Sequence, residues 1–252
     1  MESTLDQYTD KAEHYSKLKE RDWVRVVERP TVLRALGDLR NLTCMDMACG
    51  SGYYARQMKL LGAAEVIGVD YSPQMIELAR SLDDLSITYL TQDCERLEEL
   101  GMPEYFDVVF GGWMIPYIPS VERVSRFAQN LRSVVKPGGR TVQLFGNENR
   151  FSSGNVVDLM DAMGQRFEAN GHVPRDGDPY KVIIGATGDS PGVELINHYY
   201  THPTIKKCFM EAGFGECKFH SIVLQAKTTA EREKYREFVE DPLITVFEAK
   251  NV

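Results

Sequence analysis

The chain has 252 residues, 43% of them hydrophobic and 26% charged, a composition that is typical of a globular protein and excludes a disordered chain or a coiled coil. Its formal net charge is −8 and no local block of Lys and Arg offsets it, so we expect no nucleic-acid partner. Because the N-terminus lacks the apolar core of a signal peptide and no segment approaches the ~18 apolar residues of a membrane span, we predict a cytoplasmic protein without a membrane partner.

The first part of the chain alternates short apolar runs with helical patterns. A helical pattern follows the Gly50-Ser-Gly52 turn, a second begins at Ser72 as N-cap, and a third begins at Ser120. Strands are predicted at residues 43–48, 65–69, 86–90, 106–110 and 140–145. Right-handed connections between such units predict an α/β fold, a doubly wound and mostly parallel sheet whose ligand site lies at the carboxyl ends of the strands.

The pattern changes after residue 145. A partly helical segment is predicted around residues 156–167, followed by a hairpin of strands 180–186 and 193–200 that turns at 188–192. Such an insertion near the carboxyl edge of the sheet predicts a hairpin lid over the site. The remaining elements are predicted as a helix at 203–212, a strand at 216–224, a helix at 229–240 and a strand at 243–249, which add two strands to the sheet.

A glycine turn follows the first predicted strand. Gly50-Ser-Gly52-Tyr-Tyr-Ala55 fits the G-x-G-x-x-G/A pattern, and Asp70 lies about 20 residues further on, after the second strand. A tight glycine turn lets the backbone approach a nucleoside, and an acid at this place can bind ribose hydroxyls in a dinucleotide or a mononucleoside site. The glycines alone therefore do not identify the ligand.

Two further acids favour a cationic nucleoside. Asp46 lies inside the first strand directly before the turn, where a carboxylate would repel a pyrophosphate but suits a ligand with positive charge. Asp93 follows the third strand, where it can accept a hydrogen bond from the amine of an adenine. S-adenosylmethionine, with its ammonium and sulfonium groups, fits acids at three consecutive strand ends.

Five sequence segments resemble the class I S-adenosylmethionine-dependent methyltransferases in their order and spacing. They are Met45-Asp-Met-Ala-Cys-Gly-Ser-Gly52, Gly68-Val-Asp70-Tyr-Ser-Pro-Gln-Met75, Asp93, Phe106-Asp-Val-Val-Phe110 and Lys136-Pro-Gly-Gly139. The resemblance covers about residues 8–250 and implies a Rossmann-like sheet of seven strands with an antiparallel last strand. It also implies one domain, with an N-terminal helical cap (1–40), a cofactor-binding half (41–146), an inserted lid (147–202) and closing helices and strands (203–252).

The resemblance assigns cofactor roles by position. The residues that would surround S-adenosylmethionine are Tyr15, Asp46, Ala48, Cys49, Gly50, Gly52, Asp70, Tyr71, Met75, Asp93, Cys94 and Gly111. Among them, Asp70 would hold the ribose, Tyr71 and Met75 would pack against the adenine, and Tyr15 would close over the cofactor. The Gly111 carbonyl would meet the methionine ammonium. Cys49 and Cys94 belong to a set of five cysteines without a C-x-x-C pair, so we expect reduced thiols and no metal site.

Aromatic and polar residues near the fourth and fifth strands and in the insertion are candidates for binding an acceptor substrate. They are Trp113, Tyr117, Asn147, Tyr199 and Tyr200, with His198 as the candidate base. A narrower resemblance, to the toxoflavin-synthase type of small-molecule methyltransferase, is carried by Asn197-His-Tyr-Tyr200, Ala212-Gly-Phe214 and Asp241-Pro-Leu-Ile244. Pro116 and His198 depart from that group's pattern, which leaves the substrate open.

We therefore predict an enzyme that transfers a methyl group from S-adenosylmethionine to nitrogen or oxygen of a small metabolite, aromatic rings included, in secondary metabolism. One alternative is a cyclase or another non-methylating protein that uses the same cofactor, and its sequence motifs would look the same. A second is a nicotinamide-dependent oxidoreductase, which Asp46 disfavours. The Tyr15 to Lys19 spacing also argues against it, since this Tyr-x-x-x-Lys precedes the glycine turn.

Overall fold

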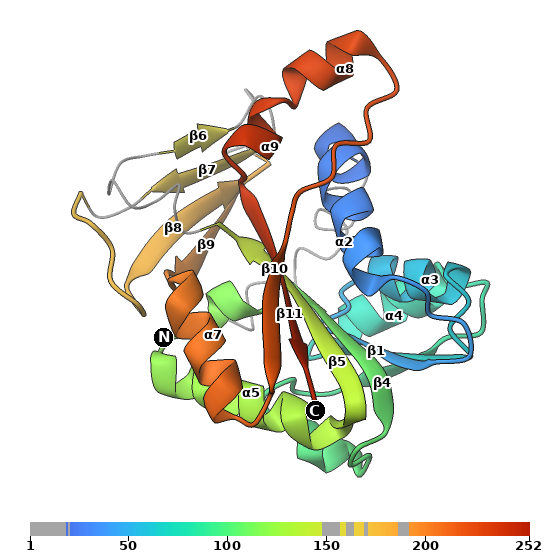
Figure 1. Cartoon of the computed structure of the whole chain (residues 1–252). Helices are drawn as coiled ribbons and strands as arrows, with labels where there is room; N and C mark the ends of the chain where they lie inside the picture. The colour runs from blue at the N-terminus through green and yellow to red at the C-terminus, as the bar shows by residue number, and fades with distance from the viewer. Residues whose placement is uncertain (1–18, 20, 148–156, 160–163, 169–170, 186–191) are drawn as a thin grey trace.

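A seven-stranded sheet forms the centre of the protein (Figure 1). The computed structural model describes residues 19, 21–147, 157–159, 164–168, 171–185 and 192–252. The strands of this sheet are β1 (Thr43–Met47), β2 (Glu65–Asp70), β3 (Thr88–Thr91), β4 (Phe106–Gly112), β5 (Val135–Gly146), β10 (Glu216–His220) and β11 (Ile244–Lys250). Their order is β10-β11-β5-β4-β1-β2-β3, and β11 alone runs antiparallel to its neighbours. The predicted mostly parallel sheet with an antiparallel last strand is confirmed.

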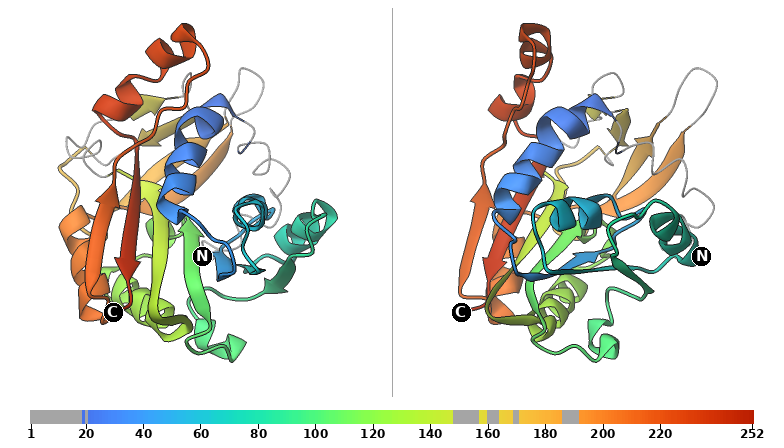
Figure 2. Two further views of the ribbon diagram at one scale, coloured as in Figure 1. Left: turned by 45° about the vertical axis from the view of Figure 1, so that its right-hand side comes forward. Right: turned by 90° about the vertical axis from the view of Figure 1, so that its right-hand side faces the viewer.

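Helices cover both faces of this sheet, as the views in Figures 1 and 2 show together. One face packs against η2 (Val24–Glu28), α2 (Arg29–Leu36), α3 (Tyr53–Leu60) and α4 (Pro73–Ser81). The other packs against η3 (Leu97–Leu100), α5 (Val121–Val134) and α7 (His202–Glu211). Two buried apolar clusters, one on each face, account for the arrangement, because a parallel sheet of this kind buries both of its surfaces.

Local sequence signals begin the helices where they were predicted. The Ser72 hydroxyl accepts a hydrogen bond from the amide of Met75, and the Ser120 hydroxyl accepts one from Arg123. In α5 the buried residues recur at helical spacing, as Val124, Phe127, Ala128, Leu131 and Val134.

The inserted segment forms a second, antiparallel sheet. Its strands are β6 (Val157–Leu159), β7 (Gln165–Glu168), β8 (Pro179–Ile184) and β9 (Val193–His198), paired in that order. The predicted β8–β9 hairpin is confirmed, whereas its turn falls among residues 186–191, outside the described residues. The predicted helix around residues 156–167 is wrong, since the described parts of that range belong to β6 and β7. In β7 burial alternates residue by residue and the strand pairs with β8, so long-range pairing overrides the local pattern.

The bounds of three further elements differ from the prediction. Strand β5 starts at Val135, before the predicted turn, because Val135 pairs with Phe106 and Arg140 with Val108, so that residues 136–139 bulge out of the ladder. Strand β10 ends at His220 instead of residue 224, since the chain then leaves the sheet, and the Val223 amide donates to the Thr31 hydroxyl of α2. The predicted helix 229–240 is two helices, α8 (Thr229–Lys234) and α9 (Glu237–Glu240), separated by the buried Tyr235.

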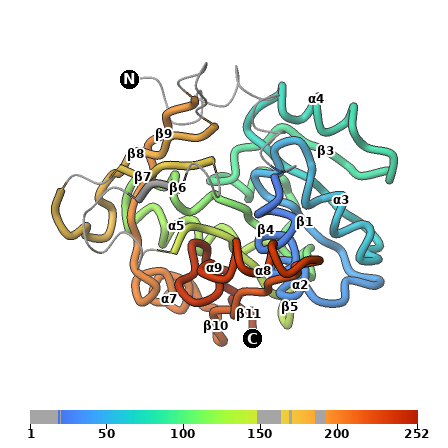
Figure 3. Tube along the Cα trace, turned by 90° about the horizontal axis from the view of Figure 1, so that it is seen from above, coloured from blue at the N-terminus to red at the C-terminus, as the bar shows by residue number. Residues whose placement is uncertain are grey.

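The second sheet lies at the carboxyl end of β4. The chain passes from β4 into η4 (Ile115–Tyr117), and Tyr117 packs against the apolar cluster of the second sheet. Figure 3, seen from above, shows β6–β9 on one side of the molecule and α3 and α4 on the other. The carboxyl ends of β1, β2, β3 and β4 therefore form one edge between the glycine-turn helix and the second sheet.

Candidate functional site

The chain turns sharply between β1 and α3. Ala48, Gly50 and Gly52 have φ values of 52°, 52° and 74°, and the Cys49 amide donates to the Val69 carbonyl of β2 at 2.9 Å. A Cβ on Gly52 would lie 2.4 Å from the Tyr89 hydroxyl, so both backbone conformation and space require glycine there. A Cβ on Gly50 would have no neighbour within 4 Å. The turn thus leaves open space above Gly50.

Asp70 joins this turn to the start of α4. One carboxylate oxygen accepts the amide of Gly50 at 2.8 Å and the other accepts the amide of Ser72 at 2.9 Å. Burial raises the pKa of Asp70, and the two backbone amides oppose that shift. A carboxylate has about four lone-pair sites, so each oxygen keeps one that could accept from a ribose hydroxyl.

Asp46 lies beneath the turn with only 2% of its surface exposed. Burial raises the pKa of Asp46 to about 7, while the Ala55 amide, which donates to it at 2.7 Å, and the charge of Lys19 oppose the shift. A carboxylate in this setting gains from a cation placed nearby, because burial penalises its charge.

The residues expected around an adenine lie beyond Asp70. Tyr71 is 42% exposed, whereas Met75 is buried below it on α4. Asp93 closes a turn by accepting the Glu95 amide at 2.9 Å. Burial raises the pKa of both Cys49 and Cys94, so these free thiols stay protonated and act as packing groups.

Gly111 makes room for a neighbouring side chain inside the sheet. It pairs with Met47 on β1 and with Gln143 on β5, and a Cβ on it would lie 2.4 Å from the Gln143 side-chain oxygen. That buried oxygen has no hydrogen-bond partner. The Gln143 amide is a feature that the sequence did not single out.

Trp113 connects the sheet edge to the N-terminal helices. Its φ is +63°, which is uncommon for a bulky residue, and its amide donates to the Leu144 carbonyl at 2.7 Å. Its indole donates to the carboxylate of Glu28 at 3.0 Å. Such a conformation persists only where the surroundings hold it, which is common at binding sites.

Glu28 is a functional candidate that sequence reasoning missed. Its side chain is 0% exposed and accepts from the Tyr54 hydroxyl at 2.8 Å, the Trp113 indole and the Lys19 ammonium at 2.5 Å. The Lys19 nitrogen also lies 4.9 Å from the centre of the Tyr54 ring. One buried carboxylate thereby joins the N-terminal helices, the glycine-turn helix and the end of β4.

A pocket opens beside this carboxylate. Its described walls come from the N-terminal helices, the end of β4 and the second sheet. The residues are Lys19, Trp23, Val24, Glu28, Trp113, Tyr117, Gln165, Phe167, Val182, Ile184 and Asn197. The structure thus brings two of the predicted acceptor residues, Trp113 and Tyr117, into one aromatic pocket.

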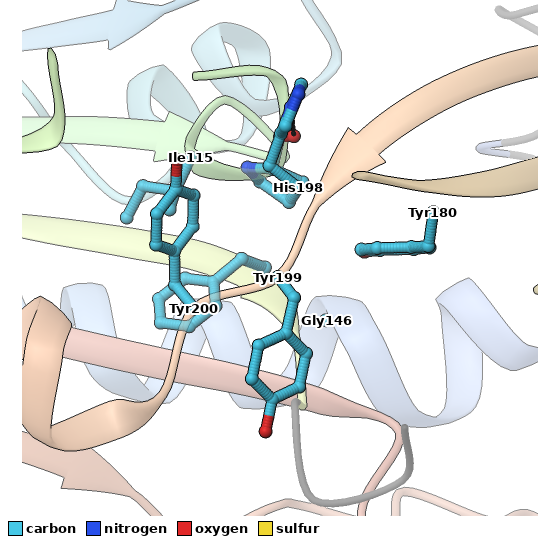
Figure 4. Close-up of a pocket in the computed structure, with 8 residues that line it drawn as sticks. Ile115, Gly146, Tyr180, His198, Tyr199 and Tyr200 are labelled. Atoms are coloured by element: carbon cyan, nitrogen blue, oxygen red, sulfur yellow. Dashed lines mark hydrogen bonds between the residues drawn. The ribbon is translucent and has the colours of Figure 1, made fainter. Parts of the chain in front are cut away.

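The other predicted acceptor residues lie apart from this pocket. His198, Tyr199 and Tyr200 line a second, smaller hollow with Ile115, as Figure 4 shows. A ring nitrogen of His198 lies 3.4 Å from the Pro116 carbonyl, and burial lowers the pKa of His198. The Tyr200 hydroxyl donates to the Ile118 carbonyl at 2.5 Å. These residues pack between η4 and the second sheet.

Asn147 and Tyr15 complete the predicted set. The Asn147 side-chain amide donates to the Pro242 carbonyl at 2.8 Å, which ties the end of β5 to the segment before β11. Tyr15 lies outside the described residues. Lys19 is the described residue nearest to it in sequence, and its charge acts on both Glu28 and Asp46.

The residues at the sheet edge fit S-adenosylmethionine. Burial disfavours the ionised forms of Asp46 and Asp70, and both side chains accept hydrogen bonds from backbone amides. A ligand with an ammonium and a sulfonium supplies the positive charge that such acids lack. The open space above Gly50 lets a ligand approach the backbone at the same place.

Comparisons with known proteins agree with this geometry. Residues 44–139 match the family model described as a methyltransferase domain. The ubiquinone biosynthesis O-methyltransferase of Neisseria meningitidis serogroup C is 36% identical over 105 residues, which cover 40% of this chain and 43% of that protein. The chain thus spans less than half the length of the curated relatives that it matches first.

Solved structures share the fold over most of the chain. An S-adenosylmethionine-dependent methyltransferase from Mesorhizobium loti superposes with a TM-score of 0.62 at 24% identity, covering 87% of this chain and 95% of that one. A DhpI–SAM–HEP complex superposes with a TM-score of 0.63 at 19% identity, covering 98% of this chain and 96% of that one. Among the described residues, each helix is too short or too polar to cross a membrane.

Proposed function

We propose that this chain is a class I S-adenosylmethionine-dependent methyltransferase that transfers a methyl group from that cofactor to nitrogen or oxygen of a small acceptor molecule. The match of residues 44–139 to a methyltransferase-domain model and the fold shared with solved methyltransferases support this proposal. The observation that carries this proposal is the meeting of two features at the end of β4. The acids around the glycine turn lie on one side of Gly111, and the aromatic pocket begins at Trp113 on the other.

The cofactor side rests on the acids and the glycine turn. Asp70 accepts hydrogen bonds from the ribose hydroxyls, and Tyr71 and Met75 pack against the adenine. Asp93, next to Cys94, accepts a hydrogen bond from the adenine amine. Asp46 acts by its charge, because it is buried below the turn. Ala48, Cys49, Gly50, Gly52 and Gly111 contribute backbone around the methionine part.

The acceptor side rests on the pocket beside Glu28. Trp113 and Tyr117 form its wall nearest to β4, and the second sheet closes the opposite wall. A small acceptor held there would lie next to the edge where the cofactor's methyl group is expected.

For methyl transfer the main task of the protein is to align the acceptor with the cofactor. S-adenosylmethionine supplies a methyl group on an already activated sulfonium. Holding the two reactants in line and away from water supplies on the order of 7–11 kcal/mol of the barrier lowering. A neutral amine needs no base, whereas a base would speed transfer to a hydroxyl by about 10²–10⁴-fold. The predicted base His198 lines the smaller hollow and not this pocket, so we assign no base to the acceptor side.

The decisive experiment measures ligand binding and product mass. We expect titration calorimetry to show binding of S-adenosylmethionine and S-adenosylhomocysteine but not of nicotinamide dinucleotides. A metabolite extract incubated with enzyme and cofactor should then yield a compound about 14 Da heavier, together with S-adenosylhomocysteine. Cofactor binding without any methylated product across such extracts would favour a non-methylating role, and dinucleotide binding would exclude the proposal.

The affinity for S-adenosylmethionine should rise with pH up to about pH 7. Burial holds the pKa of Asp46 at about 7, against about 4 in the unfolded chain. Between about pH 4 and pH 7 the folded protein therefore keeps a proton on Asp46 that the unfolded chain has released. For this reason Asp46 lowers the free energy of unfolding as the pH rises from about 4 to 7. A cationic ligand favours the ionised form, so binding at pH 6 should release a proton.

Calorimetry in two buffers of different ionisation enthalpy measures that release. Asp46→Asn should abolish it, and S-adenosylhomocysteine, which lacks the sulfonium, should release less. Proton uptake on binding, or a release that survives Asp46→Asn, would contradict the role of this charge.

A further inference from the structure

Two residues that line the pocket beside Glu28 each carry a buried polar atom without a hydrogen-bond partner among the described residues. They are the side-chain oxygen of Asn197 and the indole nitrogen of Trp23, in residues that are 5% and 3% exposed. We propose that this pocket binds an uncharged ring compound that donates a hydrogen bond to Asn197 and accepts one from Trp23. The proposal rests on the function above and narrows its acceptor to this chemical class.

Asn197 lies on β9 opposite Tyr180 of β8. Burial raises the pKa of Tyr180 to about 12, and a hydrogen bond between the Asn197 side chain and the Tyr180 hydroxyl opposes that shift, as an amide donor does. The amide oxygen is left without a partner at the pocket wall. Since a buried acceptor that lacks a donor is costly, this oxygen is suited to a ligand N–H or O–H.

The two tryptophans of the pocket differ in their partners. Trp113 donates to Glu28, whereas the indole of Trp23 has no acceptor in the part of the chain that the structure describes. Trp23 and Asn197 come to the pocket from different elements, one from the N-terminal helices and the other from the second sheet. A ligand that bridges these elements needs an acceptor group on one side and a donor group on the other.

The rest of the wall favours a neutral ring. Lys19 and Glu28, the charged residues among the described lining, pair with each other at 2.5 Å. The remaining lining is mostly aromatic and aliphatic, namely Val24, Trp113, Tyr117, Phe167, Val182 and Ile184. Among the described lining residues no opposite charge is left for a charged ligand, so burying such a ligand there would cost desolvation energy that no ion pair offsets.

The test uses the fact that the chain has only two tryptophans, both in this pocket. A ¹H–¹⁵N spectrum of the labelled protein should therefore show two indole signals, which Trp23→Phe assigns. The probes are 2-pyridone, which has one donor and one acceptor, N-methyl-2-pyridone, which lacks the donor, and the charged rings benzoate and benzylammonium. Each is titrated into protein saturated with S-adenosylhomocysteine.

We expect 2-pyridone to shift the Trp23 indole signal downfield in a saturable way. N-methyl-2-pyridone and both charged rings should bind about tenfold more weakly. Asn197→Leu should weaken 2-pyridone about tenfold and leave N-methyl-2-pyridone unchanged, because the lost bond is the one that the methylated probe never makes. Ile196→Ala, on the exposed neighbour of Asn197 in β9, is the control and should change neither probe.

Three results would overturn the proposal: tighter binding of a charged ring, an unchanged affinity of Asn197→Leu for 2-pyridone, or indole signals that respond to none of the probes. Trp23→Phe gives an independent check, because it keeps a ring in the wall and removes only the donor. A failure of the methyltransferase proposal is distinguishable, since it would appear as absent cofactor binding or absent product while the probe affinities are measured separately.

Discussion

Replacing Asp70 with alanine is expected to weaken the binding of S-adenosylmethionine by about 100-fold. The substitution removes the carboxylate oxygens that face the ribose, and hydrogen bonds to a charged group contribute about 1.5–3 kcal/mol each. At the lower of these values, two such bonds total about 3 kcal/mol, which corresponds to about two orders of magnitude in the dissociation constant. It also leaves the amides of Gly50 and Ser72 without their acceptor, so the glycine turn loses its connection to α4. Titration calorimetry with the cofactor measures the loss.

Asp83→Ala is the matched control for this experiment. Asp83 also accepts two backbone amides, those of Leu85 and Ile87 at 3.0 and 2.8 Å, but in the segment between α4 and β3. It should lower stability without changing cofactor affinity. Equal effects of the two substitutions would mean that Asp70 is only a turn residue.

Replacing Glu28 with glutamine should lower the free energy of unfolding by about 2–3 kcal/mol and reduce product formation at least tenfold. The carboxylate accepts from the Tyr54 hydroxyl, the Trp113 indole and the Lys19 ammonium, and an amide cannot accept all three. A buried donor without a partner costs about 1–3 kcal/mol. The loss of product follows because Trp113 is released from its place in the pocket wall. Urea unfolding and a methyl-transfer assay measure the two effects.

Glu248→Gln separates the two effects. Glu248 is a largely buried carboxylate that pairs with His220 and Lys218, both at 3.0 Å, on β10 and β11. This substitution should lower the free energy of unfolding by a comparable amount. The rate of methyl transfer per folded molecule should remain that of the wild type. If Glu28→Gln lowers stability but not turnover, Glu28 holds the fold and has no part in the site.

The cofactor half could be predicted because its signals are local. The cap at Ser72, the strand before Asp70 and the glycines at positions 50 and 52 each act within a few residues of where they lie in the chain. Right-handed connections then predict helices on both faces of a parallel sheet, whereas the order of its strands is a finding of the structure. The acids at three strand ends follow from the alternation of strands and helices along the chain.

The acceptor side could not be predicted because it is assembled from distant segments. Glu28 and Trp113 are 85 residues apart, and Asn197 comes from a sheet whose first strands were predicted as helix. His198 was the predicted base, yet its neighbour Asn197 is the residue that lines the larger pocket, because successive residues of a strand face opposite sides. A local pattern does not tell which side of β9 faces the pocket.

The sequence by itself therefore determined the sheet, its connections and the acids that suit a cationic nucleoside, since each depends on short-range periodicity, capping and turn chemistry. Tertiary structure alone decided the partners of the buried groups. Only packing brings Lys19, Tyr54 and Trp113 to the Glu28 carboxylate. Only packing leaves the Asn197 side-chain oxygen and the Trp23 indole nitrogen, in residues of one pocket, without partners among the described residues. Hydrogen bonding of buried polar atoms is a property of the assembled molecule, because it depends on which residues exclude water from one another.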